Sequence, residues 1–182
     1  MAIETNVGHV LQAIDFSQKR DLYFVLGRDK DWPDPSSPSP ESVTTTMIEN
    51  PLAVVKVDRL VLCYKTDEHV PDSASDGDDF VIYKGSKWKT IRSDQVLSNN
   101  QLLQPANYVC LIGTLDVAKL PMFSFTQIGV AEDVAIADNA PSKHEAQKQN
   151  VTNWGNMYFY ENRPMETYGN TQRKIMKYMI QF

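Results

Sequence analysis

The densest group of carboxylates in the chain lies in residues 67–79, DEHVPDSASDGDD. Carboxylates at the spacing D-x-D-D beside a glycine could bind a calcium ion through oxygen ligands. The spacing differs from that of the EF-hand calcium loop, which needs a glycine at its sixth position and a terminal glutamate. We therefore expect a solvated acidic loop with no bound metal, and a ligand-binding or hydrolytic site in this loop remains the alternative. The six carboxylates are Asp67, Glu68, Asp72, Asp76, Asp78 and Asp79.

Other residue types used in catalysis are present but form no recognisable motif. The three histidines, His9, His69 and His144, are far apart in the sequence and lack the local pairing that a zinc site needs. The sequence contains no G-x-S-x-G elbow, glycine-rich phosphate loop, H-E-x-x-H or C-x-x-C motif. We therefore expect neither enzymatic activity nor a cofactor.

The residues best suited to protein recognition lie in NWGNMYFYENRP, residues 153–164. Aromatic residues, methionine and arginine are enriched at the centres of protein interfaces. An arginine directly before a proline does not fit a regular central strand, so we expect Arg163 at a strand end, where its guanidinium can reach a neighbouring chain. Alternatively, the tyrosines pack in the core and Arg163 neutralises Glu161 or Glu166. The predicted partner-binding residues are Tyr158, Tyr160, Glu161, Asn162, Arg163 and Pro164.

Composition and charge exclude several classes of protein. The formal charge is -5 and the isoelectric point about 5.2, so the chain has no overall basic field for nucleic acid or anionic lipid. No stretch approaches the roughly 18 apolar residues of a membrane helix, and we expect no leader sequence. Cys63 and Cys110 lie in apolar runs, which predicts buried, reduced thiols in a protein that folds in a reducing cytoplasm.

These segments must be positioned by a fold that is mostly β. The spacing of Val7, Val10, Leu11 and Ile14, after Thr5 or Asn6 as a cap, predicts a short N-terminal amphipathic helix. Apolar or alternating runs predict strands over 22–26, 52–64, 108–115, 123–130, 157–160 and 174–182.

Two strand regions carry more detailed signals. In residues 52–64 the alternation slips around Arg59, which indicates a long or broken strand with a bulge. Residues 80–91 predict a hairpin, with Gly85 and Ser86 as a two-residue type II′ turn.

The length of 182 residues and the hydrophobic content of 42% predict one domain over residues 1–182. We expect antiparallel sheets in a sandwich-like arrangement with one short N-terminal helix. Three loops should interrupt the sheets: a proline-rich loop near 32–40, the acidic loop near 67–79 and a polar loop near 138–150.

The segment GNMYFYENRPME, followed by a glutamine and a final strand ending in phenylalanine, resembles the C-terminus of a baseplate wedge protein of T-even-type contractile-tailed bacteriophages. Successive segments of that family are also similar to LYFVLGRDKDW, VVKVDRLVLCYK, FVIYKGSKW, YVCLIGTLDVAKLPMF and FTQIGVAED, in that order. Together these segments span most of residues 22–182. The chain is far shorter than the T-even member, which suggests that an inserted domain and its contacts are absent.

The resemblance implies a non-enzymatic virion component of the tail baseplate, assembled in the host cytoplasm. It implies a wedge subunit that binds other baseplate wedge proteins and a second copy of itself, and that follows the rearrangement of the baseplate on contraction. Nucleic acid and membranes are not expected partners. Such a subunit would provide a surface complementary to its neighbours, and its residues would act by burying area against them and by hydrogen bonding.

Overall fold

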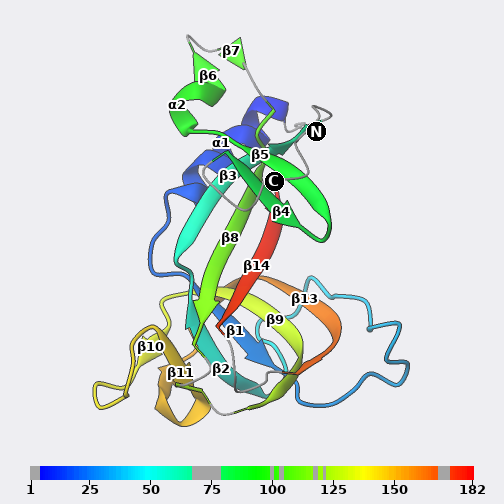
Figure 1. The fold of residues 1–182 in the computed structure, drawn as a ribbon, viewed down its shortest axis with the longest axis vertical. Helices are drawn as coiled ribbons and strands as arrows, with labels where there is room; N and C mark the ends of the chain where they lie inside the picture. The colour runs from blue at the N-terminus through cyan, green and yellow to red at the C-terminus, as the bar shows by residue number, and fades with distance from the viewer. Residues whose placement is uncertain are drawn as a thin grey trace. The chain divides into compact units, whose positions relative to one another are not determined.

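The computed structural model describes residues 5–66, 79–98, 101–102, 105–116, 119–120, 122–167 and 173–182. It is mostly β, with antiparallel sheets and a helix near the N-terminus, which confirms the predicted fold class (Figure 1). The chain divides into two compact units. The first comprises Met1–Lys19, Asp58–Ile112 and Lys177–Phe182, and the second comprises Arg20–Val57 and Gly113–Met176.

The first unit opens with helix α1 (Asn6–Ser17), which confirms the predicted helix. Thr5 caps it, since its side-chain oxygen accepts a hydrogen bond from Gly8 N at 3.1 Å. The buried face differs from the predicted stripe, because Val7 and Leu11 are exposed. The side chains that α1 buries are Val10, Ala13 and Phe16, and the Phe16 ring lies 5.2 Å from the ring of Phe182.

A five-stranded sheet in the order β14-β8-β3-β5-β4 follows. Its strands are β3 (Arg59–Lys65), β4 (Phe80–Tyr83), β5 (Ser86–Thr90), β8 (Tyr108–Leu115) and β14 (Lys174–Gln181). A short helix α2 (Ser93–Val96) and the small pair β6 (Leu97–Ser98) and β7 (Gln101–Leu102) extend from it.

The β4–β5 hairpin is confirmed, but its turn lies one residue earlier than predicted. Tyr83 pairs with Ser86, so Lys84 and Gly85 form the two-residue loop. Both have positive φ, 47° and 77°. Two positive φ angles are typical of a type I′ turn, whose twist matches that of the flanking strands, and the predicted type II′ turn is therefore wrong.

The predicted strand over 52–64 is broken in two. Strand β2 (Pro51–Lys56) joins the sheet of the second unit, and β3 joins that of the first. At the break, Asp58 N donates to Ile112 O at 2.8 Å although Arg59 is the residue that pairs with Ile112. Asp58 and Arg59 therefore both lie opposite Ile112, and two residues opposite one is the arrangement of the predicted β-bulge.

The second unit is built on a five-stranded sheet in the order β11-β2-β1-β9-β13. Strand β1 (Tyr23–Gly27) is central and wholly buried, while β11 (Glu145–Gln147) and β13 (Asn156–Thr167) are the edge strands. Strand β9 (Ser124–Glu132) lies between β1 and β13. Beside the sheet are the strand pair β10 (Ala135–Ile136) and β12 (Val151–Asn153) and the 3₁₀ helix η1 (Lys148–Asn150).

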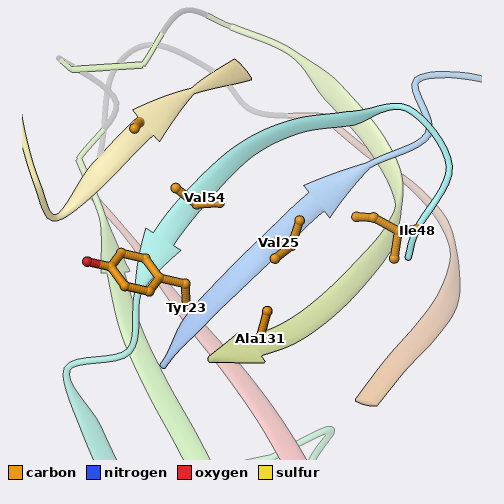
Figure 2. Close-up of a cluster of buried hydrophobic side chains, with 6 residues drawn as sticks. Tyr23, Val25, Ile48, Val54 and Ala131 are labelled. Carbon is orange, nitrogen blue, oxygen red and sulfur yellow. The ribbon is translucent and has the colours of Figure 1, made fainter. Parts of the chain in front are cut away.

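One face of this sheet carries a compact apolar core (Figure 2). The core forms because small and branched side chains of adjacent strands point to the same face. Its buried members are Tyr23, Val25, Ile48, Val54, Ala131 and Ala146.

Two sequence predictions about loops and strand lengths need correction in the second unit. Strand β11 and helix η1 lie within the predicted polar loop 138–150. Strand β11 lacks an apolar alternation, and it buries a carboxylate, Glu145, which pairs with Lys119 Nζ at 2.9 Å and with His144. The strand predicted over 157–160 runs from Asn156 to Thr167, past Pro164.

Both cysteines are free and buried in the first unit, as predicted. Burial raises the pKa of the Cys63 thiol to about 12. Cys63 Sγ also lies 3.7 Å from Met179 Sδ. The thiol therefore behaves as part of the core.

Candidate functional site

The predicted partner-binding residues all lie on β13, at the edge of the second unit's sheet. The pairing of β13 with β9 is irregular between Asn162 and Glu166, and Pro164 lies in this interval. A proline lacks the N–H that a ladder needs, so an edge strand with an irregular register can hold it. Arg163 therefore lies within the strand, and the prediction of a strand end at this point is wrong.

The Arg163 guanidinium contacts two carboxylates of its own strand. Its Nη2 and Nε lie 2.8 and 3.0 Å from Glu161 Oε2, and its Nη1 lies 3.2 Å from Glu166 Oε1. Lys174 Nζ lies 2.8 Å from the other oxygen of Glu166. Arg163 therefore pairs with Glu161 and Glu166 of its own strand, which is the alternative to a contact with a neighbouring chain. Its side chain is 14% exposed.

This cluster sets the protonation of Glu166. Burial raises the pKa of its carboxyl, but the hydrogen bonds and charges of Lys174 and Arg163 outweigh burial, so the pKa lies below its ordinary value of 4.5. The two cations and the two carboxylates, Glu161 and Glu166, balance each other. The cluster is therefore a neutral clamp on β13, with no excess charge for an ionic ligand.

A second segment, residues 32–45, runs along β13 and is called the edge cover below. Asn162 N donates to Glu41 Oε1 at 3.0 Å, and Asn162 Nδ2 donates to Ser39 O at 2.8 Å. The Tyr160 hydroxyl bonds Ser42 through the latter's N–H and its carbonyl, and lies 3.1 Å from Thr45 Oγ1. The edge cover thus satisfies polar groups that an edge strand would otherwise leave open.

Trp32 begins the edge cover and attaches it to the E-N-R-P segment. Its indole Nε1 donates to Arg163 O at 2.7 Å, and its side chain is buried. The Arg28 guanidinium lies 3.8 Å from the centroid of the Trp32 ring, and Arg28 Nε lies 3.1 Å from Glu49 Oε2. Arg28 therefore packs on the face of the indole ring in a cation–π contact, which helps to fix the position of the ring.

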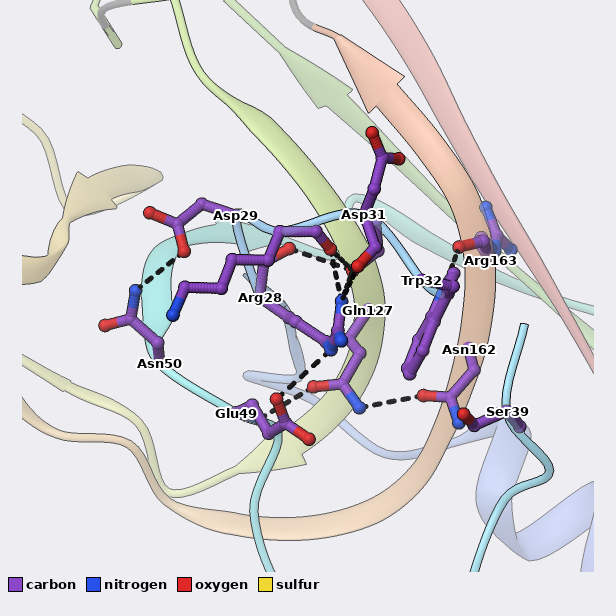
Figure 3. Close-up of polar contacts among 12 residues, drawn as sticks. Arg28, Asp29, Asp31, Trp32, Ser39, Glu49, Asn50, Gln127, Asn162 and Arg163 are labelled. Carbon is purple, nitrogen blue, oxygen red and sulfur yellow. Dashed lines mark hydrogen bonds and ion pairs between the residues drawn. The ribbon is translucent and has the colours of Figure 1, made fainter. Parts of the chain in front are cut away.

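Gln127 on β9 lies opposite Asn162 and links β13 to the backbone of Glu49. Its side-chain oxygen accepts from Glu49 N at 2.7 Å, and its Nε2 donates to Asn162 Oδ1 at 2.8 Å. The GRDKDW, FTQIG and E-N-R-P segments, three of those that carry the family resemblance, therefore meet in one hydrogen-bonded cluster (Figure 3). Their contacts support β13 and the edge cover.

Two predicted residues present substantial area to solvent. Tyr158 is 44% exposed, and its hydroxyl bonds Glu132; Pro164 is also exposed. Tyr160, Glu161, Asn162 and Arg163 are partly buried and have partners within the chain. The residues that β13 exposes to solvent are all uncharged, and they include one large aromatic ring.

Arg28, Trp32 and Gln127 also belong to this site but were not predicted from the sequence. Gln127 had a usable signal, because an amide inside the apolar run FTQIGV must find hydrogen-bond partners when buried. Trp32 gave none, since its hydrogen bond with β13 spans 131 residues of sequence, and Arg28 takes part only through its contact with Trp32.

The described residues contain no cluster of three or more His, Cys, Asp or Glu side chains that could hold a metal ion. Residues 67–78 of the predicted acidic loop, His69 included, lie outside the described part of the chain. Asp79 is described, and its carbonyl accepts a hydrogen bond from Thr90 N. None of the helices described in the structure has the length and apolar character to cross a membrane.

Comparison with known proteins identifies the family. The family described as "baseplate wedge 3 tail fiber network component" matches residues 1–182. "Virion protein 3" of Enterococcus phage phiEF24C is 26% identical over 167 residues, which cover 91% of this chain and 87% of the relative. The chain therefore belongs to the baseplate wedge 3 tail fiber network component family, which confirms the baseplate wedge resemblance of its sequence.

Proposed function

We propose that this chain is a non-enzymatic structural subunit of a contractile phage tail, which joins neighbouring baseplate wedge proteins through the surface around β13. The observation that carries the proposal is the family match over the whole chain. The exposed residues of β13 are uncharged and include an aromatic ring, which supports a protein partner over an ionic or nucleic-acid ligand.

In this proposal the six predicted residues divide into two roles. Tyr158 and Pro164 contact the partner, whereas Tyr160, Glu161, Asn162 and Arg163 hold the strand and the edge cover in place. The Tyr158 hydroxyl is already bonded to Glu132, so its ring has little rotamer freedom to lose on binding. A preorganised aromatic ring of this kind is a typical interface anchor.

The resemblance to the T-even wedge protein supports a second copy of the chain as one partner. Sedimentation equilibrium of the purified protein should then give twice the 20.7 kDa mass of a single chain. We further propose that the subunit is assembled in the host cytoplasm and follows the rearrangement of the baseplate on contraction. The hydrogen bonds that connect β13 to the edge cover would let it transmit such a movement without local unfolding.

Substitution of Tyr158 tests the proposed surface. Tyr158→Ala should leave the far-UV spectrum of the isolated chain unchanged but weaken assembly with co-expressed wedge proteins about 30-fold, the effect of losing one interface anchor of about 2 kcal/mol. Leu11→Ala is the matched control, because Leu11 is a similarly exposed apolar side chain, 51% exposed, in the other unit. Equal assembly of the parent and Tyr158→Ala would contradict the surface assignment.

A further inference from the structure

The edge cover is anchored at its two ends and buries nothing between them. Trp32 at its start is 6% exposed, and Ile48, three residues after its end, is 2% exposed and belongs to the core of Figure 2. Between these two anchors, none of the side chains of residues 33–47 is buried, and Val43 is fully exposed. This segment therefore loses no buried apolar area when it leaves the surface beneath it.

The contacts that hold residues 33–47 on β13 are polar, and most of them are open to solvent. Only the bond between Thr45 and the Tyr160 hydroxyl is partly buried. Water can replace the partners of an exposed hydrogen bond, so each such bond adds little to the attachment. The residues that make the exposed bonds are Ser39, Glu41 and Ser42, with Tyr160 and Asn162 as their partners.

Local features let the edge cover keep its shape away from β13. Its first half contains four prolines, each of which fixes φ (Figure 1). Ser37 N donates to Asp34 O at 3.1 Å, and Thr45 N donates to Ser42 O at 3.0 Å. These bonds lie within the segment, so they are kept when its contacts with β13 are lost. The edge cover can therefore move as one piece.

The outer backbone edge of β13 lies beneath this segment. In the described part of the chain no strand pairs with that side of β13. Asn162 N points to it, because it donates to Glu41 Oε1 at 3.0 Å. Backbone groups two residues apart in a strand point the same way, so the N–H and C=O of Tyr160 lie on the same side. The Glu41 carboxylate thus takes the place that the carbonyl of a paired strand would have.

We infer that the edge cover is a strap, which closes the outer edge of β13 in the isolated chain and opens as one piece between Trp32 and Ile48. An unpaired strand edge is a template for another chain, so the closed state prevents edge-to-edge association. The open state uncovers main-chain groups that can pair with a strand. The indole bond of Trp32 to Arg163 O is kept in both states, so the edge cover stays attached at this end.

Native-state hydrogen exchange of the whole chain, followed by NMR, tests whether the edge cover opens as one piece. Tyr160→Phe removes the hydroxyl that bonds Ser42 and Thr45, but it leaves the carboxylate of Glu41 on Asn162 N. If all these contacts open together, the Asn162 amide should exchange about 5-fold faster in this variant. Thr45→Val removes one of the bonds and should accelerate the exchange to a smaller extent.

One reference amide and one matched variant control the measurement. The Glu49 amide donates to Gln127 outside the two anchors, so it should keep its parent rate in Tyr160→Phe. Tyr158→Phe removes a hydroxyl of the same strand that bonds Glu132 and not the edge cover, so it should leave the Asn162 rate unchanged.

Two results would overturn the strap. An unchanged Asn162 rate in both Tyr160→Phe and Thr45→Val would show that the contacts open one by one. Equal acceleration at Glu49 and Asn162 would show that the whole second unit loosens. Neither result bears on the partner surface proposed at Tyr158 and Pro164, because the measurement is made on the isolated chain.

Discussion

Trp32 shows how a single side chain can connect distant parts of this chain. It lies in a proline-rich segment without regular structure, yet its indole bonds the backbone of Arg163, 131 residues away. Its ring is held by Arg28, which is itself paired with Glu49. At Trp32 the edge cover is therefore attached to β13 by a partly buried hydrogen bond, whose acceptor is costly to leave unpaired.

Replacing Trp32 by phenylalanine should measure that attachment. Trp32→Phe keeps an aromatic ring over Arg28 but leaves Arg163 O without its donor, so we expect a loss of about 1–2 kcal/mol in unfolding free energy. Trp88→Phe is the control, because Trp88 Nε1 is buried without a hydrogen-bond partner in the described structure. Native-state hydrogen exchange should show a smaller loss for the control, and equal losses would contradict the role of the indole bond.

The clamp on Glu166 predicts a dependence of stability on pH. Its folded pKa lies below 4.5, so it stabilises the fold above that pH, and this contribution is lost as the pH falls through the lower, folded pKa. Denaturant unfolding at pH 7 and at decreasing pH below 4.5 should show this loss. Glu166→Gln and Lys174→Met should each make the unfolding free energy fall less over this pH range. If both variants lose as much unfolding free energy as the parent, the clamp is not the source of the acid dependence.

At the scale of elements, the sequence predicts strands well where apolar residues form a run and poorly where tertiary contacts decide. Strand β8 has the predicted bounds because its apolar residues are continuous. Strand β11 is missed because its pairing with β2 depends on a buried carboxylate whose cation, Lys119, comes from elsewhere in the chain. The extent of β13 past Pro164 is missed because edge position, which makes the proline tolerable, is a property of the assembled sheet.

The turn between β12 and β13 gives a prediction at this scale. Gly155 has a φ of 74°, and an added Cβ would lie 2.0 Å from Glu132 O. Gly155→Asn should therefore destabilise the second unit by more than the roughly 1–2 kcal/mol of left-handed strain alone. Gly85→Asn is the matched control: Gly85 has a φ of 77°, but an added Cβ meets no atom within 4 Å.

Thermal unfolding of the two glycine variants compares them directly. The Gly85 variant should unfold near the parent temperature, because asparagine is well tolerated in a type I′ turn. The Gly155 variant should unfold several degrees lower. Similar midpoints for both variants would show that the backbone at Gly155 shifts to accommodate a side chain.

At the scale of the whole molecule, each compact unit is assembled from separate stretches of the chain. The E-N-R-P segment could be recognised from the sequence as a candidate site, because aromatic residues, an arginine and a proline follow one another there. Its internal partners could not, since the edge cover, Gln127 and Arg28 approach it through the fold of the second unit.

The central claim is that this chain is a structural baseplate subunit which binds its neighbours through β13. A cryo-electron microscopy reconstruction of the assembled phage tail, at a resolution that shows side chains, tests it most directly. We predict density for this chain in the baseplate, with Tyr158 and Pro164 buried against another protein chain. A baseplate without this chain, or one in which both residues remain exposed to solvent, would contradict the account.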